Sequence, residues 1–186
     1  MNDVLKVIKE RRSVRRFTSE QLSNKALNAI LEAGLYAPSA HNQQPWHFTV
    51  VQSKELIDAL SRDTKIALGK SKDERTRSLS TKEKFHVFYE APTLIVVSGK
   101  EDALMPTTDC AAAAQNMLLA AESIGIGGCW NGFVGALFYD EAGEAYKESL
   151  NIPEGYQPYY ALTFGHSDSG QQTPSPRKEN RISYIK

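Results

Sequence analysis

Apolar residues recur at helical spacing in the first part of the chain. Residues 4–11 carry apolar side chains on one face and charged side chains on the other, which predicts a short amphipathic helix. A second helix is predicted to begin at a cap on Ser23 and to stop at Pro38. Its apolar stripe consists of Leu27, Ile30, Leu31, Gly34 and Leu35. Both helices are therefore expected to bury one face only.

Three later segments have the length and composition of β-strands. Residues 47–51 alternate, residues 93–98 are apolar almost throughout, and residues 159–164 form the last strand. Residues 107–123 predict a long helix that is apolar nearly all round, which belongs in a core or between subunits. A shorter helix is expected over residues 140–150. Strands separated by helices indicate a single α+β or α/β domain with a small central sheet.

The most polar part of the chain is predicted to be a long loop. A helix is expected to begin near Glu55 and to end near Leu60, and residues 61–84 then carry many basic residues among Asp and Ser. Loops of this length are commonly lids over a site, although a solvated surface excursion accounts for the composition equally well. A second polar segment, residues 166–186, forms the tail of the chain.

Composition limits the possible functions. The 186 residues suffice for one domain with its own core, and 22 basic residues balance 22 acidic residues. Balanced charge gives no general attraction to nucleic acid or to an anionic membrane, so neither partner is expected. Cys110 and Cys129 lack metal-ligand spacing, and the N-terminus lacks the apolar segment of a signal peptide. These observations predict a reduced, cytoplasmic protein without a metal.

Four arginines lie close together after the first predicted helix. Arg11, Arg12 and Arg15 could surround a phosphate monoester together with the hydroxyl of Ser13, since bidentate guanidinium contacts are the strongest protein partners of phosphate. The alternative is that these cations complement the C-terminal end of the helix dipole.

Residues 38–46 are rich in turn-forming and hydrogen-bonding side chains. Asn42 and Gln44 supply amide groups suited to the polar edge of a flat ring, whereas Trp46 is expected to pack in the core. Together with the arginines, this segment indicates a ligand that is both phosphorylated and planar. Flavin mononucleotide (FMN) fits that description.

Residues 125–132 are rich in glycine but do not form a dinucleotide fingerprint, because the last glycine of that motif is absent and a helix precedes it. The glycines are expected to turn the chain sharply and to bring the main chain close to a flat ligand. Cys129 is expected to be a packed thiol, since no basic partner is evident near it in the sequence.

These motifs, in this order, resemble the nitroreductase family of FMN-dependent oxidoreductases. The segments that carry the resemblance span the chain and are RRSVRRF, APSAHNQQPWHF, APTLIVVSG, AAAAQNMLLAAESIGIGGCWNGF and TPSPRKENR. The resemblance implies an α+β fold with a central, mostly antiparallel sheet flanked by helices, in an intertwined homodimer that holds FMN at its interface. Residues 61–90 would then form a variable lid, and residues 167–186 a tail that reaches the partner subunit.

The resemblance also implies that widely separated parts of the chain bind the cofactor. The phosphate end would be bound by Arg11, Arg12, Ser13 and Arg177. The flavin ring would be met by Arg15 near N1 and C2=O, by Trp130, Asn131 and Gly132 near N5, and by Pro38, Ser39, Ala40 and Asn42 from the partner subunit.

The activity implied by the resemblance is a two-step transfer of electrons. NAD(P)H would pass a hydride to flavin N5, and a small aromatic acceptor such as a nitroaromatic compound or a quinone would then take the electrons, in a ping-pong scheme. No side chain need act as acid, base or nucleophile, because the cofactor carries the chemistry. Two alternatives keep the cofactor: other FMN chemistry (reductive dehalogenation, dehydrogenation or flavin fragmentation), and a flavin-binding or storage module without turnover.

Overall fold

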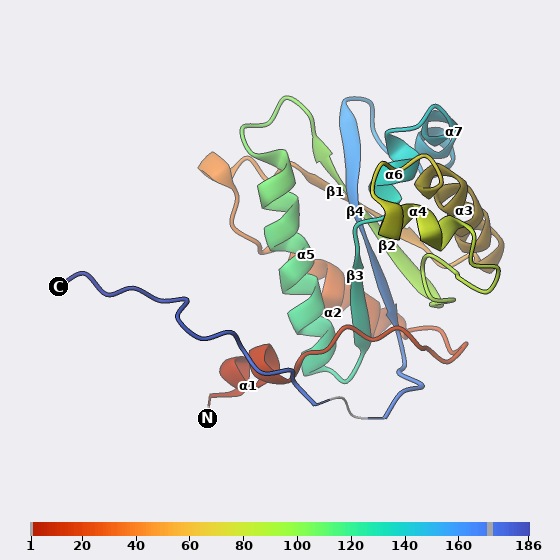
Figure 1. Cartoon of the computed structure of the whole chain (residues 1–186). Helices are drawn as coiled ribbons and strands as arrows, with labels where there is room; N and C mark the ends of the chain where they lie inside the picture. Colours follow the sequence, from red (N-terminus) through yellow and green to blue (C-terminus); the bar gives the residue numbers. More distant parts are fainter. Residues whose placement is uncertain (1, 171–172) are drawn as a thin grey trace.

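A central antiparallel sheet organises the chain (Figure 1). The computed structural model describes residues 2–170 and 173–186. The sheet has four strands in the order β1-β2-β4-β3, namely β1 (Trp46–Val51), β2 (Thr93–Lys100), β4 (Tyr156–Gly165) and β3 (Gly127–Asn131). All three neighbouring pairs are antiparallel. The predicted α+β class with an antiparallel sheet is therefore confirmed.

Helices cover both faces of this sheet (Figure 1). One face packs against α2 (Asn24–Leu35) and α5 (Pro106–Ser123). The other face packs against α3 (Lys54–Leu68), α6 (Val134–Phe138) and α7 (Ala142–Ser149). Three shorter elements lie outside these layers: α1 (Asp3–Glu10), the 3-10 turn η1 (Ala40–Asn42) and α4 (Glu74–Ser80).

Strand β2 is covered on both faces, which explains why its sequence is apolar almost without interruption. Side chains alternate between the two faces of a strand. Ile95 and Val97 join the core on the α2–α5 side, whereas Leu94 and Val96 join the core on the α3 side, and all four are fully buried. The predicted burial of this strand on both faces is confirmed.

Helix α5 fills the space between the sheet and α2. Its inward face consists mainly of small residues such as Ala113 and Ala114, both fully buried. The two helices are in close contact at Gly34, where an added Cβ would collide with Met117. Within residues 2–170 and 173–186, none of the helices combines the length and the hydropathy that crossing a bilayer requires.

The prediction of a long loop over residues 61–84 is wrong. Helix α3 begins after the cap Ser53, whose hydroxyl accepts the N–H of Leu56, and continues to Leu68. Helix α4 then begins after Asp73. The buried face of α3 includes Ser61 and Thr64. Polar residues therefore occupy some of the buried positions at which apolar residues would have indicated a helix.

The predicted sharp turn of the chain over residues 125–128 lies at the first of these glycines, and β3 begins within the same segment. Gly125 turns the chain, with φ of +76°, but Gly127 and Gly128 already belong to β3. A Cβ at Gly128 would lie 2.9 Å from both Leu118 Cδ2 and Phe164 Cε1. This glycine is needed because the strand lies close to the core, not because the backbone bends.

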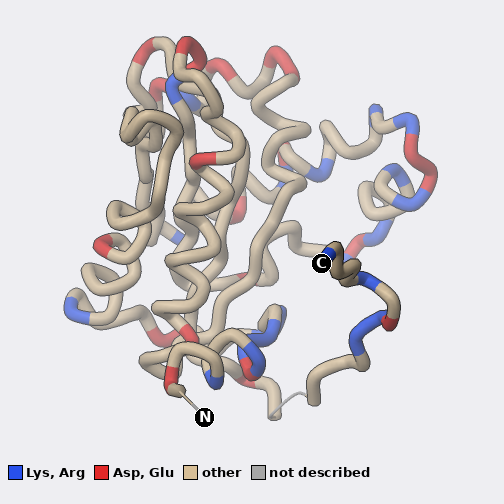
Figure 2. The backbone as a smooth tube through the Cα atoms, turned by 90° about the vertical axis from the view of Figure 1, so that its left-hand side faces the viewer, with Lys and Arg blue, Asp and Glu red and all other residues tan. Residues whose placement is uncertain are grey.

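The two ends of the chain lie outside the main layers. Residues 173–186 are exposed and leave the folded body as an extended segment (Figure 1). In this tail, basic positions lie on both sides of an acidic one (Figure 2). The acidic residue is Glu179, and the basic residues are Arg177, Lys178 and Arg181. The predicted tail also includes residues 171 and 172, which lie outside the described part of the chain.

Candidate functional site

The arginine segment crosses the edge of the sheet at β3. After the C-cap Arg11, Ser13 forms a parallel bridge with Gly128, and the N–H of Val14 donates to the carbonyl of Gly128 at 3.0 Å. Four residues further on, the N–H of Thr18 donates to the carbonyl of His166 at 2.9 Å. These main-chain bonds fix the segment beside β3 and leave the arginine side chains to meet other groups.

Arg11, Ser13 and Arg15 gather around the thiol of Cys129. Burial raises the pKa of this thiol, and the nearby guanidinium groups of Arg15 and Arg11 and the hydroxyl of Ser13 act in the opposite direction. The expectation that Cys129 has no basic neighbour is therefore wrong, because the bridge between Ser13 and Gly128 joins the two segments. The expectation that the thiol is packed is confirmed, since its exposed fraction is 1%.

Arg12 points elsewhere. Its guanidinium donates to the carbonyl of Lys9 and, at 3.0 Å, to the carbonyl of Glu10, at the end of α1. This is the contact with the helix C-terminus that the sequence offered as an alternative to phosphate binding. These bonds use two of its five N–H donors, and the assignment of Arg12 to the phosphate stays a prediction.

Arg15 lies over an aromatic ring from another part of the chain. Its Cζ atom is 5.8 Å from the centroid of the Tyr89 ring, which is cation–π distance. The two side chains line a groove of about 330 Å³ together with Phe17, Lys84 and Phe85. Tyr89 and Phe85 therefore face this groove, whereas Phe88 is fully buried in the core.

The end of β3 contributes residues with different degrees of freedom. Trp130 packs its ring against Tyr160, with centroids 4.7 Å apart. Asn131 is buried and occupied at both ends, because its Nδ2 donates to Val87 O at 2.6 Å and its Oδ1 accepts from Phe133 N at 2.9 Å. Gly132 is exposed, and an added Cβ would meet nothing within 4 Å. Of the three, Gly132 offers the most accessible main chain.

The loop around η1 is held in an uncommon conformation. His41, Asn42 and Gln44 have φ of 49°, 55° and 47°, which costs non-glycine residues roughly 1 kcal/mol or more each. Ser39 Oγ accepts the N–H of Gln44 at 2.9 Å, and Asn42 Oδ1 accepts Gln44 Nε2 at 3.0 Å. These bonds hold the loop, while the side chain of Pro38 is exposed.

A buried carboxylate on α5 also holds this loop, and sequence reasoning missed it. Asp109 is 5% exposed, and its Oδ1 accepts the N–H of Ala40 at 3.1 Å. Its other oxygen has no hydrogen-bond partner among the described residues. The only sequence signal was an acidic residue in the first turn of a helix rich in alanine.

The single chain does not bring all the predicted site residues together. The η1 loop lies beside the N-terminal end of α5, and α1 lies near its C-terminal end (Figure 1). The 18 residues of α5 span about 27 Å. Arg177 belongs to the exposed tail, residues 173–186, which leaves the folded body as an extended segment (Figure 1).

The residues around Arg15 fit a ligand with an anionic end and a flat ring. Among residues 2–170 and 173–186, no carboxylate forms an ion pair with Arg11 or Arg15. Their charges are therefore available to an anion. The groove beside Tyr89 and the open main chain at Gly132 leave room for a ring.

Comparisons with known proteins find similar sequences and structures. The family model described as "Nitroreductase family" matches residues 8–166. A nitroreductase structure with bound FMN from Bacteroides fragilis NCTC 9343 is 37% identical, with a TM-score of 0.92 and coverage of 100% of both chains. One from Desulfitobacterium hafniense DCB-2, also with bound FMN, is 33% identical, with a TM-score of 0.91 and the same coverage. An Archaeoglobus fulgidus protein named for NADH dehydrogenase or NAD(P)H nitroreductase activity is 33% identical over 166 residues, which are 89% of this chain and 86% of that protein.

Proposed function

The chain belongs to the nitroreductase family, and from that premise we propose that it transfers electrons from NAD(P)H to nitroaromatic or quinone-like acceptors through bound FMN. Its class, an FMN-dependent NAD(P)H oxidoreductase, is supported by the FMN in two similar structures and by the NAD(P)H in the name of a relative. When bound, FMN supplies the redox chemistry, since its N5 atom can accept a hydride and return electrons.

The protein's own residues bind and orient the cofactor. Arg11 and Ser13 would bind the phosphate monoester, because a guanidinium and a hydroxyl lie together beside β3 and no carboxylate of the described residues pairs with Arg11. The N–H of Gly132 would approach N5, because this glycine is exposed and the space beside its Cα is open. Both roles require binding only, so no proton transfer by a side chain is invoked.

Arg15 would lie along the ring at N1 and C2=O. Tyr89 supports its guanidinium from one side, and the positive charge would favour a cofactor that gains negative charge on this edge. This role follows from a fixed charge near the ring and not from acid–base chemistry, since an arginine stays protonated in proteins.

A complete site would need two copies of the chain. The η1 loop and the arginine segment lie near opposite ends of α5, which spans about 27 Å. In a homodimer, Pro38, Ser39, Ala40 and Asn42 would meet the FMN bound by the partner, and Arg177 would reach a phosphate through the tail. The proposed setting is the cytoplasm, where thiols such as Cys110 and Cys129 stay reduced.

The observation that carries the proposal is the pair of guanidinium groups, Arg11 and Arg15, gathered at β3 without carboxylate partners in the described chain. The test is to record the visible spectrum of the purified protein, to add NADH or NADPH anaerobically, and then to add menadione or nitrofurazone. Bleaching by the nicotinamide and recovery with the acceptor are expected, with parallel double-reciprocal plots. A yellow protein that NAD(P)H reduces slowly would instead indicate a binding module, and negligible NAD(P)H oxidation with either acceptor would indicate other FMN chemistry.

A further inference from the structure

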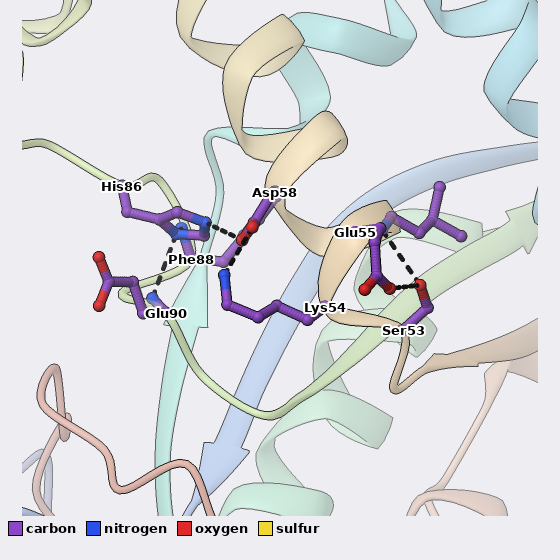
Figure 3. Close-up of polar contacts among 8 residues, drawn as sticks. Ser53, Lys54, Glu55, Asp58, His86, Phe88 and Glu90 are labelled. Carbon is purple, nitrogen blue, oxygen red and sulfur yellow. Dashed lines mark hydrogen bonds and ion pairs between the residues drawn. The ribbon is translucent and has the colours of Figure 1, made fainter.

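His86 lies beside α3 (Figure 3), and it also lines the groove that contains Arg15. Its Nδ1 atom accepts two main-chain hydrogen bonds, from Phe88 N and Glu90 N, both at 3.1 Å. Its Nε2 atom lies 3.4 Å from Asp58 Oδ1 on α3. The imidazole of His86 thus lies between α3 and the main chain of residues 88–90.

The hydrogen bonds define the protonation state of this imidazole. A nitrogen that accepts two N–H groups carries no proton, so the neutral ring has its proton on Nε2, facing Asp58. Asp58 is itself bound by Lys54 at 2.6 Å (Figure 3). Burial lowers the pKa of His86, and the carboxylate of Asp58 opposes this effect. The neutral form is therefore the stable one at neutral pH.

The other charged groups near His86 come from three parts of the chain. From α3 come Lys54, Asp58, Arg62 and Lys65; from its own loop come Glu83, Lys84 and Glu90; and from the far side of the groove come Arg15, Arg16 and Asp168. Because positive and negative groups are mixed here, their effects on the charge of His86 oppose one another. The hydrogen bonds to Nδ1 therefore distinguish the neutral from the protonated imidazole more sharply than these charges do.

The turn that His86 holds is strained and carries Tyr89. Tyr89 and Glu90 have φ of 58° and 54°, a region that non-glycine residues occupy only when neighbouring contacts enforce it. The turn is also anchored before this point, because Val87 N donates to Ser61 Oγ at 2.8 Å. Two main-chain bonds also close the turn, from Tyr89 N to the carbonyl of His86 and from Ala91 N to the carbonyl of Phe88, both at 3.1 Å. The bonds to Nδ1 add a side-chain contact at Phe88 and Glu90. The Tyr89 ring then meets Arg15.

We propose that His86 is a positioning residue for the cofactor site: its neutral ring holds the Phe88–Glu90 turn, so that Tyr89 supports Arg15. The inference rests on the proposed function, in which Arg15 contacts the flavin. Protonation of Nδ1 converts an acceptor into a donor, and both main-chain bonds must then break. The support for Arg15 is therefore present above the pKa of His86 and lost as the pH falls through it.

The test compares three variants of the FMN-loaded protein. His86→Asn keeps an acceptor in nearly the same place but cannot titrate, and His86→Ala removes the acceptor. His47→Asn is the matched control, because His47 is another half-buried histidine whose pKa burial lowers, on β1. The measurements are the dissociation constant of FMN and the flavin midpoint potential between pH 5 and pH 8, with the amide NMR signals of Phe88 and Glu90.

Below the lowered pKa of His86, the wild type and His47→Asn should bind FMN more weakly by roughly 3- to 10-fold, and both amide signals should titrate with the same midpoint. His86→Asn should lack this step in FMN affinity. At pH 8 its flavin midpoint potential should equal that of the wild type. His86→Ala should behave at pH 8 as the wild type does in acid.

Three outcomes would overturn the proposal. They are an unchanged step in His86→Asn, amide signals that titrate while the flavin stays unaffected, and a wild-type affinity in a folded His86→Ala. Should His86→Ala not fold, His86→Asn alone decides. A wild type that binds no FMN at any pH would refute the proposed function as well, whereas a flavoprotein that is insensitive to His86 refutes this inference alone.

Discussion

At the scale of single residues, the arginines of one short segment have different surroundings. Arg12 contacts the end of α1, Arg16 lies 3.4 Å from Asp168, and Arg11 and Arg15 approach Cys129. The motif predicts a phosphate site, but only the structure separates a helix contact and an exposed ion pair from Arg11 and Arg15, which pair with no carboxylate in the described part of the chain.

Replacing Arg11 by alanine should weaken FMN binding by about 10- to 150-fold, because a charge-assisted contact with phosphate is worth roughly 1.5–3 kcal/mol. Fluorescence titration of the apoprotein with FMN measures this directly. Arg16→Ala is the matched control from the same segment, since Arg16 forms an exposed ion pair, and it should change the affinity less than twofold. Equal affinities for the wild type and Arg11→Ala would remove Arg11 from the site.

At the scale of elements, the sequence predicts the helices and strands whose buried positions are apolar. Residues 93–98 are predicted as a strand and lie in β2, and residues 107–123 are predicted as a helix and lie in α5. The second half of α3 escaped prediction because Ser61 and Thr64 occupy its buried face. A polar composition predicts a loop for this segment, and only the packing of α3 against the sheet shows that it is helical.

The same limit applies to the candidate site. The motif around Arg11 and Arg15 is visible in the sequence, but its contact with Cys129 depends on the bridge between Ser13 and Gly128. The contact of Arg15 with Tyr89 depends on a left-handed turn at a non-glycine residue. Neither a distant pairing nor an unusual φ angle follows from local propensity.

Gly128→Ala should lower the free energy of unfolding by about 1–3 kcal/mol, because the new methyl group would crowd two buried side chains. The crowded atoms are Leu118 Cδ2 and Phe164 Cε1, both at 2.9 Å. Urea unfolding followed by circular dichroism measures the loss. Gly170→Ala serves as the control, since its Cβ would meet nothing within 4 Å. If the two variants unfold at the same urea concentration, the packing argument for β3 is wrong.

At the scale of the whole molecule, apolar residues remain exposed on α1. Val4, Leu5 and Ile8 are 63%, 52% and 49% exposed, although α1 is amphipathic and its apolar face would ordinarily be covered. Ile182, Tyr184 and Ile185 in the tail are also exposed. The proposed homodimer would cover both sets.

Leu5→Asp should shift the protein towards monomer, because a charge would replace an apolar contact at the proposed interface. Sedimentation velocity over a range of protein concentrations measures the equilibrium. Ile66→Asp is the matched control, since Ile66 is 62% exposed on α3, on the other side of the sheet. A wild type that stays monomeric at all concentrations would contradict the homodimer, and equal shifts in both variants would contradict the role given to α1.

The bond from Val14 to the carbonyl of Gly128 has one further consequence. β3 ends the sheet on its side, and a bare edge strand invites pairing with strands of other molecules. The segment that carries Arg11 and Arg15 blocks that edge. Whatever loosens the segment, including loss of the ligand that its arginines bind, should therefore also promote aggregation. Protection against aggregation and retention of the cofactor would then depend on the same few residues.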